Sequence, residues 1–291
     1  MSTRAWEPMW LDSDSRCLYA ALHGVPARAS TGVVFVPPLL HEQPRSRRFL
    51  TEAAARLAAM GLPCLRFDFF GTGDSDGSGD KLDFVSMGAD LELAIAALRA
   101  RAGVDRVVVL AWRGAALPVM EWLQQSSQAD LLVLWEPIVD GADWLTELEQ
   151  DDAAERASRP RPRPGIPRSA PADDGQLMGF AVSQRFRRDL TEARLVDAPV
   201  QPARTPMQNA TAQLPPHVPI WAVMRHDAPA LPIRVGRVLP LPATAPTFNG
   251  GASMEATFFL SPALERVVDD LGRALREAHA PDQVLLEQGI R

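Results

Sequence analysis

Side chains that could bind or activate a ligand follow the apolar runs of this sequence. In chain order the set is Pro38, Leu39, His41, Glu42, Asp68, Trp112, Arg113, Glu136, His226, Asp227 and Asn249. Carboxylates and imidazoles are the usual groups of general acid–base catalysis, and a guanidinium can hold a carboxylate or a developing negative charge. Because parallel sheets bind ligands beyond the carboxyl ends of their strands, the set predicts one pocket at that end of a sheet.

The elements that must position this set alternate along the chain. Continuous apolar runs, typical of strands buried on both faces, occupy 32–36, 64–67, 106–111, 131–135, 218–224 and 233–239. Apolar residues at helical spacing occur at 48–60, 84–100 and 115–123, and a last helix begins at Ser261-Pro262. This alternation predicts an α/β fold with a doubly wound, mostly parallel sheet. Residues 9–23 are typical of an antiparallel hairpin in front of that sheet.

The alternation breaks between residues 141 and 216. The segment 155–171 holds five Arg and five Pro, a composition that cannot pack a core and that favours a flexible, cationic linker. Residues 177–195 have the pattern of a short helical lid element. We therefore expect a core built from 1–140 and 217–291, with 141–216 inserted as a cap.

Composition excludes several classes of protein. The 291 residues are 46% hydrophobic and 23% charged, as in a folded, soluble protein. A net charge of −6 favours neither nucleic acid nor anionic membranes as partners, and no apolar run approaches the ~18 residues of a membrane span. Two cysteines make neither a disulfide framework nor a zinc site. We expect a cytoplasmic protein without a metal or cofactor.

Two loops resemble those of the α/β-hydrolase fold. Residues 68–77, DFFGTGDSDG, are similar to the loop after its fourth strand, and 111–115, AWRGA, to its nucleophile elbow. More narrowly, five segments resemble the exosortase A system-associated hydrolases, particularly the second type: PPLLHEQPRSRRFL, RFDFFGTGDSDG, VVLAWRGAAL, LVLWEPIVDG and MGFAVS. The resemblance is close over 30–145 and loose elsewhere. It implies a lid in the insert and a role near exopolysaccharide production and the sorting of proteins with a PEP-CTERM tail.

The catalytic residues usual for this fold are not in place. The elbow normally presents a serine, but Arg113 stands at that position, and a guanidinium that stays protonated is no nucleophile. The triad histidine should lie within 244–252, which contains none, and Asp227 at most matches the triad acid. Ser-His-Asp acyl transfer is therefore not supported. The resemblance implies that arginine at the elbow is the usual form of the second type.

Individual residues leave structural and functional interpretations open. A buried arginine must be paired, so Arg113 is expected to bind Glu42 first or Glu136 second, and it can contact a ligand as well. His41 and Glu42 form either a general base beside the oxyanion-hole loop or a pair at the pocket rim. The Gly-rich loop 71–79 lacks the phosphate-binding pattern and favours a turn.

Two functional hypotheses follow. The first is a non-catalytic pseudoenzyme that binds a small acyl- or sugar-bearing ligand, or a protein partner, above Arg113. The second is an ester or thioester hydrolase or acyltransferase, in which His41, Glu42 or Asp227 activates water while Arg113 holds the oxyanion. Asp227 and the neighbouring His226 are either a relic triad acid with a base beside it, or a surface loop pair or cap. The missing serine and histidine favour the first hypothesis, and the name of the resembling family favours the second.

Overall fold

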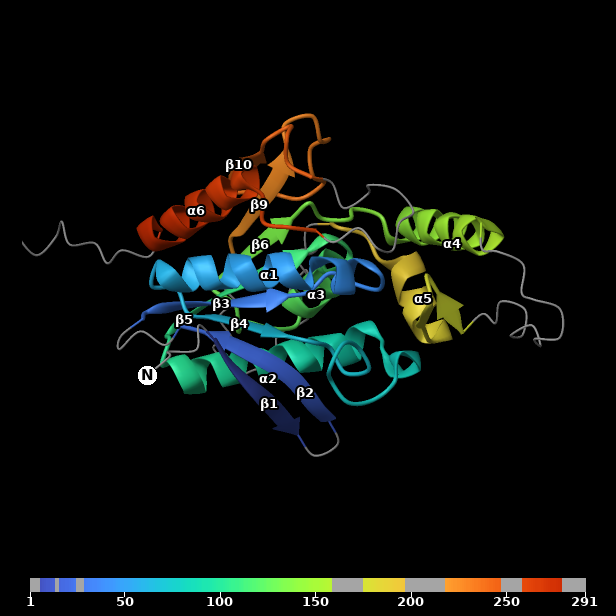
Figure 1. Ribbon diagram of the computed structural model, residues 1–291, viewed down its shortest axis with the longest axis horizontal. Helices are drawn as coiled ribbons and strands as arrows, with labels where there is room; N and C mark the ends of the chain where they lie inside the picture. Colours follow the sequence, from blue (N-terminus) through green and yellow to red (C-terminus); the bar gives the residue numbers. More distant parts are fainter. Residues whose placement is uncertain are drawn as a thin grey trace, which may run out of the picture.

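The computed structural model describes residues 6–13, 16–24, 29–158, 175–196, 218–246 and 258–278 (Figure 1). Eight strands form one sheet in the order β1-β2-β4-β3-β5-β6-β9-β10. They are β1 (Trp6–Ser13), β2 (Arg16–His23), β3 (Thr31–Val36), β4 (Cys64–Phe67), β5 (Arg106–Trp112), β6 (Leu131–Trp135), β9 (Ile220–Arg225) and β10 (Arg237–Leu241). The six strands from β4 to β10 in this order pair in parallel, and the β1–β2 hairpin joins β4 antiparallel. The predicted doubly wound, mostly parallel sheet and its hairpin are confirmed.

Helices cover both faces of the sheet. They are α1 (Glu42–Ala59), α2 (Phe84–Ala102), α3 (Ala116–Leu123), α4 (Gly141–Ser158), α5 (Gln184–Glu192) and α6 (Pro262–Glu277), with short 3₁₀ turns at Gly79–Lys81 and Arg113–Ala115. Helices α1 and α6 pack side by side on one face, around a core that includes Phe49, Trp112 and Trp135. Helices α2 and α3 pack on the other face. Both faces of the central strands are therefore buried, as their continuous apolar runs predict.

Two element boundaries differ from those predicted. Helix α1 begins at Glu42 and not at 48, because the amides of Glu42 and Gln43 bond to the carbonyls of Leu39 and Leu40 and start the helix within the loop. Pro44 is accommodated in the first turn, where its missing N–H costs little. The last strand covers 237–241 and not 233–239, since its pairing with β9 starts after Gly236.

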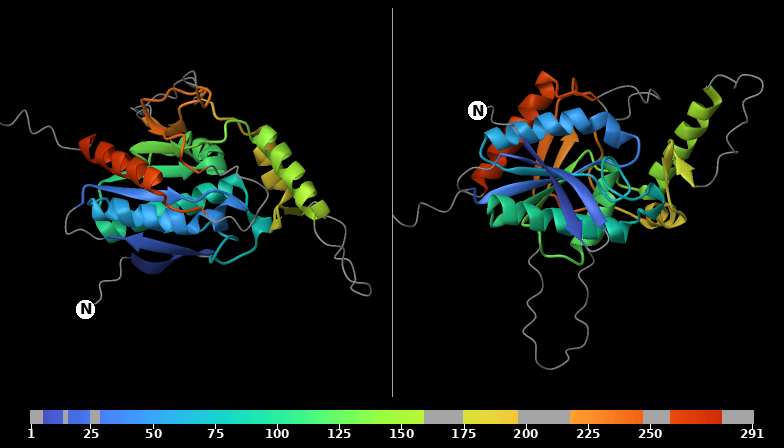
Figure 2. Two further views of the ribbon diagram at one scale, coloured as in Figure 1. Left: turned by 45° about the horizontal axis from the view of Figure 1, so that its top comes forward. Right: turned by 60° about the horizontal axis from the view of Figure 1, so that its bottom comes forward.

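The described part of the insert lies at the carboxyl ends of the parallel strands. It comprises α4, the two-stranded hairpin of β7 (Gln176–Leu177) and β8 (Phe180–Ala181), and α5. Figures 1 and 2 show α4 and α5 next to each other at that end of the molecule. Residues 155–158 are the last turn of α4 and not part of a linker, and 159–171 lie outside the described residues. The division into a core of 1–140 and 217–291 and a cap of 141–216 stays a prediction.

Helix α5 is held against the start of α2. Asp189 accepts a hydrogen bond from the Phe84 amide, and the Ser183 hydroxyl donates to the Leu82 carbonyl. Arg185 adds an ion pair with Asp83, the N-cap of α2. These contacts fix α5 and the residues before it on the core, and α4 packs against α5.

Candidate functional site

The turn after β5 is strained at Arg113. This residue has φ 53°, in the left-handed region that costs a residue with a side chain about 1–2 kcal/mol. Leu40, in the loop after β3, and Glu136, directly after β6, also have positive φ angles of 54° and 42°. The three neighbouring strands β3, β5 and β6 are thus each followed by a strained residue. Strained residues cluster at functional sites. The predicted sharp strand-to-helix turn at Arg113 is present.

Arg113 forms a buried ion pair with Glu42, the first residue of α1. Its Nε lies 3.2 Å from Glu42 Oε1, and only 8% of Arg113 and 3% of Glu42 is exposed. Burial raises the pKa of Glu42, and the adjacent Arg113 charge opposes that shift. Glu42 Oε2 is buried without a hydrogen-bond partner. The pairing expected first, with Glu42, is therefore observed.

Glu136 has a different role from the one expected. Its carbonyl accepts a hydrogen bond from the Arg113 guanidinium at 3.3 Å, whereas its carboxylate pairs with Arg225 at 2.9 Å. The Arg225 guanidinium also donates to the carbonyls of Ala245 and Pro246. Arg225 thus joins the end of β6 to the loop after β10. Our sequence interpretation missed this residue, although an arginine as the last residue of a buried strand is itself a signal.

His41 precedes Glu42 and is mostly buried. Burial and the positive charges of Arg45 and Arg113 lower its pKa to about 4, and Asp151 on α4 opposes that shift. Its Nδ1 is buried without a hydrogen-bond partner. The imidazole is therefore neutral at pH 7, with a nitrogen that no described group satisfies.

Trp144 of α4 covers the elbow. Its indole is 4% exposed and lies so close to Gly114 that a Cβ on that glycine would overlap the ring. Only glycine fits after Arg113 while Trp144 stays in place. We did not predict Trp144 as a site residue. An aromatic residue four positions into the insert helix is ordinary in a sequence, and only the fold brings it to the elbow.

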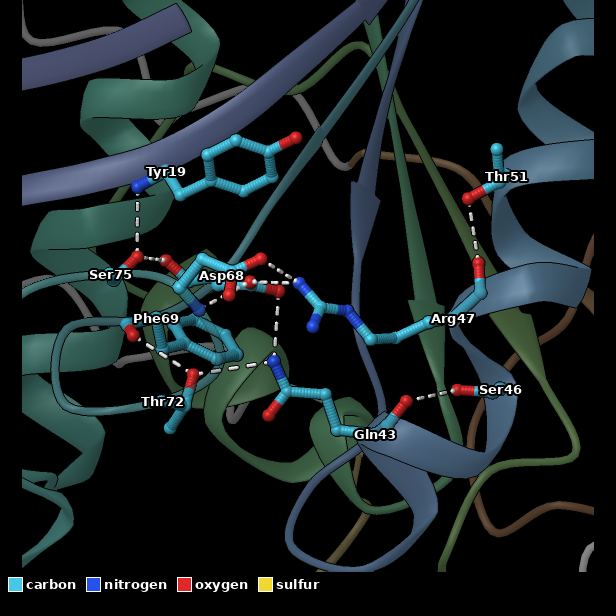
Figure 3. A network of polar contacts seen from close by, with 10 residues as sticks. Tyr19, Gln43, Ser46, Arg47, Thr51, Asp68, Phe69, Thr72 and Ser75 are labelled. Carbon is cyan, nitrogen blue, oxygen red and sulfur yellow. Dashed lines mark hydrogen bonds and ion pairs between the residues drawn. The ribbon is translucent and has the colours of Figure 1, made fainter. Parts of the chain in front are cut away.

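The loop after β4 is held by a satisfied polar network (Figure 3). Asp68 accepts hydrogen bonds from Gln43 at 2.9 Å, from Arg47 at 3.0 Å and from the Asp74 amide at 3.0 Å. Gly73, with φ 56°, passes so close to Asp68 that a Cβ would overlap the carboxylate. The network fixes loop 68–78 to α1, which supports the turn interpretation of the Gly-rich segment.

The remaining predicted residues divide between the core and the surface. Pro38, Leu39 and Trp112 are buried, and Trp112 stacks on Trp135 with 4.3 Å between ring centroids. Neither indole nitrogen has a hydrogen-bond partner. His226 and Asp227 form an exposed turn after β9. Asn249 lies outside the described residues.

Neither a protein-family model nor a curated protein sequence matches the chain. Solved structures do match over nearly its whole length. DcsB in complex with its substrate analogue is 13% identical, with a TM-score of 0.58 over 95% of this chain and 100% of that one. Est1E from Butyrivibrio proteoclasticus with bound ferulic acid is 15% identical, with a TM-score of 0.54 over 92% and 98%. The α/β hydrolase GrgF from Penicillium sp. sh18 is 15% identical, with a TM-score of 0.51 over 81% and 88%.

The fold of these solved structures agrees with the resemblance of the two loops to the α/β-hydrolase fold.

Within the described ranges no helix has both the length and the apolar character of a membrane span. The strand order, the parallel pairing, the strained turn after β5 and the likeness to solved structures that include an α/β hydrolase lead to one conclusion: the chain has the α/β-hydrolase fold.

Proposed function

We propose that this protein is a non-catalytic, ligand-binding member of the α/β-hydrolase fold. The observation that carries the proposal is the buried Arg113–Glu42 pair at the position where the fold places its nucleophile. An arginine supplies no nucleophilic atom, and its guanidinium is held by Glu42 and by the Glu136 carbonyl. The strained turn is retained without a group that could form an acyl-enzyme.

The charges around the elbow indicate the class of ligand. Arg113 is matched by Glu42 and Arg225 by Glu136, so neither pair leaves an excess charge to attract an ion. Glu42 Oε2 and His41 Nδ1 are buried polar atoms without hydrogen-bond partners. A neutral ligand with hydroxyl or amide groups would satisfy both, which favours a sugar-bearing or polar acyl compound over a bare anion. A ligand must also contact or displace Trp144, which lies on Gly114.

The biological setting of the proposal comes from five sequence segments. Their resemblance to exosortase A system-associated hydrolases of the second type supports a role linked to exopolysaccharide production and PEP-CTERM protein sorting. In a strain that lacks this protein, the wild-type gene should restore polysaccharide export and the Arg113→Ala gene should not. Equal rescue by both genes, at equal protein levels, would show that the role in polysaccharide export does not depend on Arg113.

The catalytic part of the proposal has a direct test. The purified protein should not be labelled by a fluorophosphonate probe and should not hydrolyse short-chain nitrophenyl esters above a heat-inactivated control. Arg113→Ser should also remain inactive, because a hydroxyl alone has no base to take its proton. Labelling of the wild type at one serine, with turnover abolished by its substitution, would refute the proposal.

A second candidate is ester or thioester hydrolysis by activated water. It is favoured by one observation: a neutral His41 with an unpartnered Nδ1 lies beside Glu42 and within electrostatic reach of Arg113. The imidazole would take a proton from water while Arg113 stabilises the oxyanion. A pKa of about 4 makes it a weak base, which counts against the mechanism.

The two candidates make opposite predictions for thioester substrates. Under the second, His41→Ala lowers turnover about 100-fold, as loss of a general base does, and Gln125→Ala, a control in the exposed turn after α3, leaves turnover unchanged. Under the first, wild type and both variants show the same background rate.

A further inference from the structure

A cavity of about 460 Å³ lies beside β9 and β10, away from the Arg113–Glu42 pair. Its lining is mostly apolar side chains from both strands and from the connection between them, with Arg225 and His226 as the polar members. The volume is within the range of small-molecule sites, which are concave and mostly apolar with few polar groups. Nothing in the proposed function of the elbow uses this cavity.

Within the described residues, no helix covers the face of β9–β10 that lines the cavity. Parallel strands are normally covered on both faces. Helix α6 covers one face, where Leu239 and Leu241 are buried. On the other face the crossover is the 226–236 segment, which contains no helix, and Val238 is left 57% exposed. The concave shape and the mostly apolar lining are those of a small-molecule site.

The polar groups near the cavity indicate what it can hold. The Arg225 guanidinium is committed elsewhere, to the Glu136 carboxylate and the carbonyls of Ala245 and Pro246. His226 is the lining residue whose imidazole is both polar and exposed. We propose that this cavity binds a small, uncharged, predominantly apolar molecule, with one hydrogen-bonding group that meets His226.

The same surface is poorly suited to a peptide added as a further strand. β10 is one edge strand of the described sheet, and Pro240, its fourth residue, has no N–H to offer to a partner strand. A compact apolar molecule fills the concave volume without needing that edge. This geometry favours a small ligand over a protein partner.

The test uses the full-length protein and the neutral fluorophore 1-aminoanthracene. Its emission should rise saturably on binding. Val238→Lys, which places a charge in the cavity, should weaken binding at least about tenfold. Val85→Lys is the matched control, because Val85 is an equally exposed valine (63%) on α2, away from the cavity. His226→Leu should weaken binding by a smaller factor, since it removes one hydrogen bond.

Two results would overturn the proposal. One is equal fluorophore affinity in wild type, Val238→Lys and Val85→Lys. The other is a dimer, seen by light scattering, that becomes monomeric in Val238→Lys, which would assign the cavity to a second copy of the chain. If Val238→Lys fails to fold, as judged by circular dichroism, Ala230→Trp replaces it, because it fills the cavity from an exposed position. Retained affinity in a folded Ala230→Trp protein refutes the site in the same way.

Discussion

The start of α1 contributes to two arginine–carboxylate pairs, Arg47–Asp68 after β4 and Glu42–Arg113 after β5. The two carboxylates differ in how many of their hydrogen bonds are made. Asp68 accepts three hydrogen bonds, and its partner Arg47 is 40% exposed at the side chain. Glu42 is 3% exposed, accepts a bond from Arg113 on one oxygen and leaves the other without a partner. A satisfied network with one partly exposed cation holds a loop in place. A strained, incompletely satisfied pair in the interior costs stability, and such costs persist where they serve function. The difference supports a structural role for the Asp68 network and the binding role that we propose for the elbow.

Breaking the buried pair should have the largest effect. Arg113→Ala leaves Glu42 as a buried carboxylate without its cation and should lower the free energy of unfolding by about 3–5 kcal/mol. Urea denaturation of wild type and variant measures this. The double variant Arg113→Leu/Glu42→Leu removes both charges and should recover most of the loss. A loss below about 1 kcal/mol for Arg113→Ala would show that the pair is not buried as described.

Lowering the pH should have the second-largest effect on the free energy of unfolding, through His41. The pKa of His41 is lowered to about 4, against about 6.5 in an unfolded chain. The unfolded state therefore binds more protons between these values, so the stability that neutral His41 contributes is present above pH 6.5 and is lost as the pH falls toward 4. The loss should reach roughly 1–3 kcal/mol. Denaturation midpoints at pH 7 and pH 4.5 measure it.

The matched variant for this pH experiment is His41→Gln. This variant should remove the part of the pH dependence of stability that His41 causes. The part due to His23 should remain, because His23 is a fully buried imidazole whose pKa is also lowered to about 4. Glu42 acts in the opposite direction, because a raised carboxyl pKa favours the folded state as the pH falls. The difference between wild type and variant is therefore the informative quantity. An unchanged pH profile in His41→Gln would contradict the assignment.

Disturbing the close contact between Trp144 of the insert and Gly114 of the elbow should have an intermediate effect on stability. Gly114→Ala places a methyl group into the Trp144 ring and should cost about 1–3 kcal/mol, as overpacking does. In a Trp144→Ala background the same change should cost little, so a double-mutant cycle should show a coupling energy of similar size. Additive losses would mean that α4 does not rest on the elbow in solution.

The sequence predicts the sheet well because continuous apolar runs have few alternatives. Six runs became six parallel strands, and the sharp turn at Arg113 and its pairing with Glu42 followed from their positions after neighbouring strands. The start of α1 was misplaced, because loop amides that bond to Leu39 and Leu40 extend the helix toward the site. Trp144 was missed because its role arises only when distant segments meet, whereas Arg225 was missed although its place at the end of a buried strand was a signal. Local pattern predicts elements, and long-range packing decides which of their side chains meet.

The smallest effect should come from the satisfied network. Arg47→Ala removes one of three hydrogen bonds to Asp68 and leaves the Gln43 amide and the Asp74 backbone amide in place. Because Arg47 is 40% exposed, water replaces much of what its charge contributes, and the cost should be at most about 1 kcal/mol. Added salt should reduce even that difference, whereas it should barely change the loss in Arg113→Ala, since buried charges are screened less. Urea denaturation of both variants at low and high ionic strength makes the comparison. If Arg47→Ala cost as much as Arg113→Ala, the loop after β4 and not the elbow would be the more sensitive region, and the contrast between a structural network and a binding site would fail.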